Sequence, residues 1–143
     1  MSPDLFAKLH GASTHLPLVF VGFSWGCDSA AFLAPRRPWS SELKSFAYWS
    51  MAIGAFGCVP AVVTGLLMTR GEVLGHDALR MHHLFIWPAF GLTVLLAVWR
   101  LLARNPVATP ARWQFAVYLC GGLIATVLMS GAGYWGGELL LES

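Results

Sequence analysis

The segment FAYWSMAIGAFGCVPAVVTGLLMT, residues 46–69, runs for 24 residues without one charged side chain. A helix rises about 1.5 Å per residue, so about 20 apolar residues cross the hydrocarbon core of a bilayer. The segment therefore predicts a transmembrane helix. Pro60 does not weaken this prediction, because proline inside a membrane helix bends the helix rather than ending it.

Three further segments are apolar over a similar length, and short connections between them hold most of the charges. The predicted helices are approximately 16–34, 46–69, 81–103 and 113–135, and the third has its apolar part at 81–99. Four consecutive spans with short connections predict an all-α, integral membrane four-helix bundle with up-down-up-down topology. We expect residues 1–143 to form a single membrane domain in contact with the lipid bilayer.

The composition excludes several classes of function. Hydrophobic residues make up 57% of the chain and charged residues 11%, whereas soluble domains have about 25% charged residues. No basic stripe with interleaved aromatic residues is present, so nucleic acid is not an expected partner. The chain shows no phosphate loop, nucleophile elbow or catalytic dyad, and we predict no catalytic residue. Cys27, Cys58 and Cys120 lack the close spacing of a metal or redox motif.

The distribution of basic residues predicts the orientation. One side of the bundle is predicted to hold Arg36, Arg37, Lys44, Arg100, Arg104 and Arg112, and the other Lys8, Arg70 and Arg80. By the positive-inside rule the first group is cytoplasmic, so both termini are expected outside, in the periplasm of a bacterial inner membrane. Because Arg36 and Arg37 follow the first apolar segment, we interpret it as a retained helix rather than a signal peptide.

All five histidines fall on the predicted outer side: His10, His15, His76, His82 and His83. His15 and the pair His82–His83 lie in the predicted first turns of the first and third helices. These helices run in parallel, so their histidines are expected at the same depth.

An internal similarity places these two helices opposite each other. Residues 64–74, TGLLMTRGEVL, resemble residues 130–140, SGAGYWGGELL, with an offset of 66 residues. We infer two tandem α-hairpin repeats of the same orientation, related by a pseudo-two-fold axis along the membrane normal. Histidines of the first and third helices would then approach each other across that axis.

Helical periodicity suggests which side chains face inward. The face of His15 continues through Gly22 and Gly26, and the face of His82 continues through Ala89, so both faces are smooth. The face of His83 continues through bulky residues and is predicted to point to the interface or lipid. The short match of THL at 14–16 with HHL at 82–84 instead equates His15 with His83, so either neighbour remains a candidate ligand.

The favoured hypothesis is a b-type haem between the first and third helices, with His15 and His82, or His83, as axial ligands. Gly22, Gly26 and Ala89 would border the haem, and Arg80 would neutralise a propionate. The protein would transfer electrons between quinone and a periplasmic redox partner, such as a cytochrome c, as a subunit of a membrane complex.

Two alternatives remain open. One is a zinc or copper site at the outer rim that combines histidine with Glu138 or Glu72. The other is a structural or assembly subunit without a cofactor, since small residues are ordinary packing surfaces in membrane helices.

Asp28 is a separate candidate, because a carboxylate within a membrane span is usually functional. Two interpretations are open for this residue: an ion pair with Arg36 or Arg37, and a proton-transfer role beside a quinone.

Three motifs carry a family resemblance over nearly the whole chain: GASTHLPLVF (11–20), VVTGLLMTRG (62–71) and GYWGGELLLES (133–143). They resemble a bacterial family of four-helix membrane proteins known as domain of unknown function 2231. His15 with Pro17, and Gly136 to Leu139, keep its most specific positions, whereas Met68 replaces an acidic residue that the family often has. The resemblance implies a bacterial inner-membrane protein, and some relatives are joined to cytochrome c-like modules.

Overall fold

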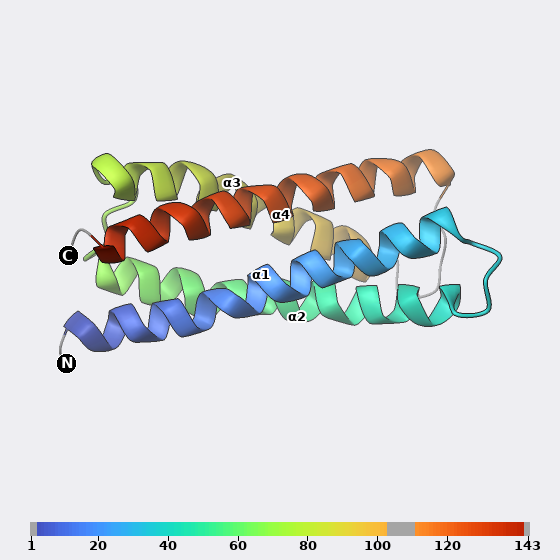
Figure 1. Cartoon of the computed structure of the whole chain (residues 1–143), viewed down its shortest axis with the longest axis horizontal. Coiled ribbons are helices and arrows are strands. Elements are labelled where there is room, and N and C mark those ends of the chain that lie inside the picture. The colour runs from blue at the N-terminus through green and yellow to red at the C-terminus, as the bar shows by residue number, and fades with distance from the viewer. Residues whose placement is uncertain (1–2, 103–110, 142–143) are drawn as a thin grey trace.

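The computed structural model describes residues 3–102 and 111–141, and these residues form four α-helices (Figure 1). The helices are α1 (Pro3–Leu33), α2 (Ser40–Met68), α3 (Asp77–Leu102) and α4 (Arg112–Leu141). Consecutive helices run antiparallel, so the N- and C-termini lie at the same end of the bundle (Figure 1). We call this the terminal end; the opposite end, with Arg36, Arg37 and Arg112, is the arginine end.

Each helix is long and apolar enough to cross a membrane, with mean hydropathy between 1.4 and 2.0 over its most apolar stretch. Large apolar side chains such as Leu33, Phe56 and Leu95 point outward, with 81%, 79% and 63% of their surface exposed. Such residues suit a lipid environment, because the hydrocarbon core replaces water as the solvent. The predicted all-α class with four membrane helices is therefore confirmed.

The helices extend beyond the predicted apolar segments. The first helix begins at Pro3 rather than near residue 16, and the last continues to Leu141 rather than ending near residue 135. Hydropathy detects only the part of a helix that suits hydrocarbon, whereas the backbone hydrogen bonds continue through polar residues at the interface. The longer α1 moves His15 from the predicted first turn to more than three turns inside the helix.

Within the first hairpin, glycines of α2 allow a close approach of α1. A Cβ atom on Gly54 would lie 3.2 Å from the backbone nitrogen of Val21, and one on Gly57 would lie 3.1 Å from the Cβ of Leu16. Small residues on a membrane helix permit this backbone proximity, which supplies van der Waals contact in place of a hydrophobic driving force.

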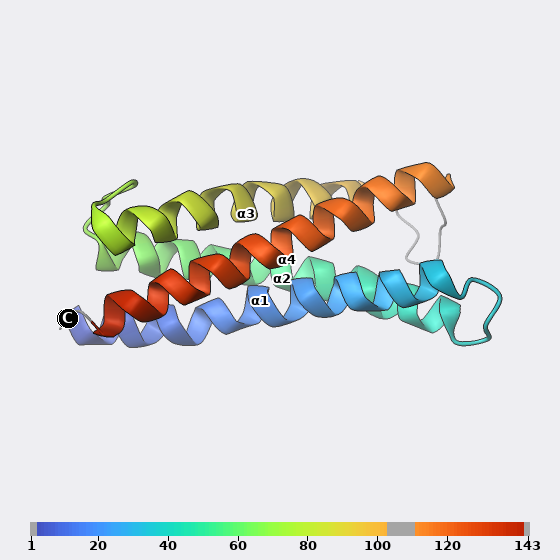
Figure 2. The same ribbon diagram turned by 45° about the horizontal axis from the view of Figure 1, so that its top comes forward.

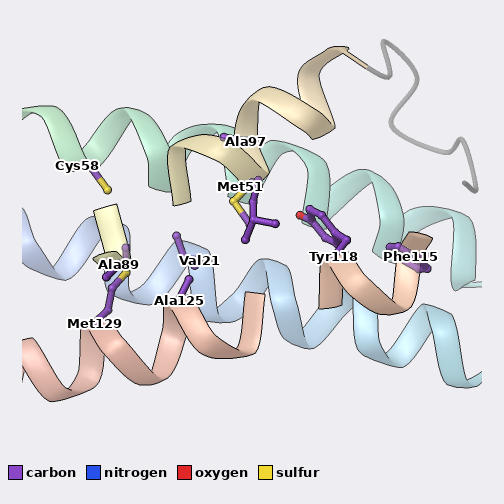
Figure 3. Close-up of a cluster of buried hydrophobic side chains, with 10 residues drawn as sticks. Val21, Met51, Cys58, Ala89, Ala97, Phe115, Tyr118, Ala125 and Met129 are labelled. Carbon is purple, nitrogen blue, oxygen red and sulfur yellow. The ribbon is translucent and has the colours of Figure 1, made fainter. Parts of the chain in front are cut away.

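The apolar core lies between the two hairpins. Val21 of α1, Met51 of α2, Ala89 of α3 and Ala125 of α4 are fully buried there (Figure 3). Contacts between helices are most extensive within each hairpin, α1 with α2 and α3 with α4, and α4 is inclined to α1 (Figure 2). The hairpins are therefore the tightly packed units, and polar groups at both ends of the bundle join them.

Candidate functional site

Two histidine rings meet between the hairpins at the terminal end. His10 of α1 and His82 of α3 have ring centres 6.2 Å apart, with an angle of 74° between the ring planes. Each ring is part-buried. The pair thus brings together one imidazole from each hairpin, in a partly dry setting.

A backbone carbonyl of the neighbouring helix orients each ring. The Nδ1 atom of His10 lies 2.9 Å from the carbonyl oxygen of Ala61, and Nδ1 of His82 lies 2.8 Å from that of Ala132. A carbonyl oxygen can only accept, so Nδ1 donates in both bonds and each Nε2 keeps its lone pair. Within the described chain neither Nε2 makes a hydrogen bond.

Glycines on the neighbouring helices provide the space for these rings. A Cβ atom on Gly65 would lie 3.0 Å from Cε1 of His10, and one on Gly136 would lie 3.3 Å from Nδ1 of His82. In each hairpin the glycine follows the accepting alanine by four residues, as in Ala61–Gly65 and Ala132–Gly136. The second hairpin thus repeats these contacts with the alanine and glycine 71 residues, and the histidine 72 residues, along the chain, not at the offset of 66 expected from the sequence.

A third histidine is adjacent to this pair. The ring centre of His83 lies 5.7 Å from that of His82 and 6.0 Å from that of Trp87, whose Nε1 donates to the carbonyl oxygen of Val73. His83 is only 6% exposed, and its Nδ1 has no hydrogen-bond partner among the described residues. The predicted orientation of His83 toward lipid or the interface is therefore wrong, because Trp87 and the α2–α3 connection cover that side of α3.

His15, the ligand predicted for the first helix, is exposed, and the ring that meets His82 belongs to His10. The cause is the early start of α1, which places His10, not His15, near the depth of His82. The face shared by His15 and Gly26 is exposed rather than internal, and nothing lies within 4 Å of the position of a Cβ on Gly26.

The other predicted site residues are dispersed. Gly22 faces Thr126 of α4, and Ala89 belongs to the apolar core about two turns from His82. Arg80 is exposed in the first turn of α3, on the same helix as His82. Glu138 is half-buried within α4, and Glu72 is exposed in the α2–α3 connection. Across residues 3–102 and 111–141, no three His, Cys, Asp or Glu side chains are arranged to hold a metal ion.

A second polar pair joins α1 and α3 in the half of the bundle nearer the arginine end. Nη2 of Arg100 donates to Oδ1 of Asp28 over 2.9 Å and to the carbonyl oxygen of Lys44 on α2 over 3.1 Å. Asp28 is fully buried and Arg100 is 7% exposed. The guanidinium carbon also lies 5.4 Å from the ring centre of Tyr118 on α4, so Arg100 contacts all three other helices.

The ion pair corrects two expectations. Asp28 pairs with Arg100 rather than with Arg36 or Arg37, and Arg100 is a buried residue of α3 rather than one of the cations on the predicted cytoplasmic surface. Arg100 follows the buried Thr93 by seven residues, and a seven-residue spacing also links His10, Pro17, Ser24 and Ala31 on α1. This near-heptad spacing, typical of helices that face a bundle core, is the signal that identifies His10 and Arg100.

Comparison with known proteins identifies the family and nothing more specific. No curated protein and no solved structure matches the chain significantly. The family model described as "Predicted membrane protein (DUF2231)" matches residues 7–143, a segment that includes the histidine pair and the ion pair. The chain therefore belongs to the family called domain of unknown function 2231, as its motifs suggest.

Proposed function

We propose that this protein is a b-type cytochrome-like membrane subunit that holds one haem between α1 and α3, with His10 and His82 as axial ligands. The observation that carries the proposal is the pair of imidazole rings, one from each hairpin, 6.2 Å apart and each anchored through Nδ1. His10 replaces His15 as the ligand from the first helix.

The ring separation supports a shared iron. Each bond between a metal and an imidazole nitrogen is about 2 Å long, so imidazoles on opposite sides of one metal have ring centres about 6 Å apart. Histidine ligands commonly donate the other ring N–H to a carbonyl or carboxylate, which fixes the ring and makes the ligating nitrogen more basic. His10 and His82 both have this arrangement.

The surroundings also suit a haem. His10 and His82 would hold it between the hairpins, where contacts are less extensive than within each hairpin. The exposed Arg80, two residues before His82, provides a cation for a propionate at the terminal end. Held by two histidines, a haem would supply electron transfer rather than catalysis at the iron.

Charge distribution supports a periplasmic location of the site. With Arg100 excluded as a buried residue, Arg36, Arg37, Lys44 and Arg112 remain on the arginine side among the described residues, against Lys8, Arg70 and Arg80. The positive-inside rule then gives an inner-membrane protein with both termini in the periplasm. We propose electron transfer between quinone in the bilayer and a periplasmic carrier or a larger redox complex.

The direct ring contact between His10 and His82 favours one alternative, a cofactor-free structural subunit in which these rings only pack the hairpins together. Reduced-minus-oxidised optical spectra of the protein purified in detergent distinguish the two functions. We expect a Soret band and a sharp α band at the b-type position. His10→Ala and His82→Ala should each remove most of the signal, whereas His15→Ala and His76→Ala, at exposed positions, should retain it.

A colourless preparation from haem-sufficient cells would exclude the haem proposal and favour the structural role. Loss of the bands in His15→Ala but not in His10→Ala would show that the ligand from α1 is assigned incorrectly. His83→Phe keeps a ring of similar size beside Trp87, and we expect the bands to persist in this variant.

A further inference from the structure

A surface hollow at the arginine end combines charged and apolar walls. It has a volume of about 670 Å³, and its lining comes from the end of α1, the α1–α2 connection and the start of α4. The lining residues are Leu33, Ala34, Pro35, Arg36, Arg37 and Arg112. Two arginines from one connection and one from α4 thus line a single concavity.

Within the described chain none of these three arginines forms an ion pair with a carboxylate. The ion pair between Asp28 and Arg100 lies elsewhere, in the bundle interior. Glu42 is the one acidic residue between Asp28 and Glu72, and the sequence from 78 to 137 contains none. Because like charges gathered without counter-ions repel each other, the hollow favours an anionic ligand.

Arg112 is held in place by an aromatic contact. Its guanidinium carbon lies 5.3 Å from the ring centre of Phe32, and that ring packs edge-to-face against Phe115 at 5.7 Å. A cation above a ring face is attracted to the ring while its N–H groups remain free to donate. A side chain already held in position loses less conformational entropy when a ligand binds.

The rest of the lining is apolar: Leu33, Ala34 and Pro35. Leu33 is 81% exposed, and Trp113, which follows Arg112, is 68% exposed. Tryptophan is enriched at the headgroup level of membranes, and basic pockets near membrane helix ends bind phospholipid headgroups. A free phosphate ion would use only the charged wall, whereas a phospholipid would use both.

We propose that this hollow binds the headgroup of an anionic phospholipid, with its phosphate against Arg36, Arg37 and Arg112 and an acyl chain along Leu33. The proposal is independent of haem binding, because the hollow is at the opposite end of the bundle from His10 and His82. Either proposal can fail without affecting the other.

Native mass spectrometry of the full chain in detergent tests the site, with phosphatidylglycerol as the probe and phosphatidylcholine as the zwitterionic comparison. We expect one tightly retained phosphatidylglycerol and at least tenfold weaker retention of phosphatidylcholine. Each cation near anionic lipid contributes about fivefold to binding, so Arg36→Gln with Arg37→Gln should weaken phosphatidylglycerol binding about 25-fold. The matched control, Lys8→Gln with Arg70→Gln, removes the same charge at the terminal end and should leave binding within about twofold.

Equal losses in the two double variants would overturn the proposal, because attraction would then follow total charge rather than this hollow. Equal retention of the two lipids would also overturn it. Displacement of phosphatidylglycerol by millimolar inorganic phosphate would identify a free-anion site and contradict lipid binding. Leu33→Ser, which leaves every arginine in place, should weaken lipid retention if an acyl chain lies along this wall.

Discussion

His10 and His82, unlike the exposed histidines, each have a carbonyl acceptor on a neighbouring helix. The acceptor is available because an alanine and a glycine, four residues apart, leave the helix surface open for a flat ring. A fixed Nδ1–H leaves a fixed Nε2 lone pair, so residues that never touch a ligand would influence ligand chemistry at the proposed site.

At the residue scale, the two glycines provide a matched test of this orientation. Gly65→Ala places a methyl group 3.0 Å from His10, and Gly136→Ala places one 3.3 Å from His82, whereas Gly133→Ala meets nothing within 4 Å. We expect haem content per protein, measured by absorbance, to fall several-fold in the first variant and less in the second.

Gly133→Ala should retain its haem content and gain up to about 1 kcal/mol of stability, since alanine favours a helix more than glycine does. A uniform loss in all three variants would indicate a general packing defect rather than displacement of the histidine rings.

At the scale of the helices, two polar contacts hold α1 against α3. Both polar pairs, His10 with His82 and Asp28 with Arg100, link these two helices, and along α1 they are separated by about 27 Å. The apolar core lies between the pairs. The ion pair therefore fixes the relative register of the hairpins at a distance from the histidine pair.

Removal of one partner of a buried ion pair leaves an uncompensated charge and costs about 3–5 kcal/mol, whereas removal of both partners costs much less. We therefore expect Asp28→Asn and Arg100→Gln each to destabilise the bundle strongly. The double variant should recover most of the loss, as measured by denaturant unfolding in detergent micelles. Additive losses in the double variant would mean that the two side chains do not stabilise the bundle as a pair.

Sequence patterns predict the four helices better than they predict which polar side chains form the histidine pair and the ion pair. Apolar length identifies four membrane helices because hydrocarbon thickness sets that length directly. The start of α1 does not follow from hydropathy, because residues 3–15 are polar enough for the interface and still helical. Hydropathy therefore favours His15 over His10, and charge counting groups Arg100 with the cytoplasmic cations although its seven-residue spacing from Thr93 indicates a buried face.

At the scale of the whole molecule, the bundle has a histidine pair at one end and an arginine-lined hollow at the other. If the positive-inside rule holds, the terminal end is periplasmic. On a cysteine-free background, Val73→Cys, in the exposed α2–α3 connection, should react with a membrane-impermeant maleimide in intact bacterial cells. Ser41→Cys, exposed near the start of α2, should react only after the cells are opened. The reverse labelling pattern would place the histidine pair on the cytoplasmic side.

Electron paramagnetic resonance of the oxidised protein tests most directly the proposal that the hairpins share one iron through His10 and His82. Two imidazole ligands give a low-spin ferric signal, and loss of one ligand converts it to a high-spin signal. We expect a low-spin signal in the native protein and a high-spin signal, or loss of haem, in both His10→Ala and His82→Ala. A high-spin signal in the native protein, or an unchanged low-spin signal in His10→Ala, would contradict it.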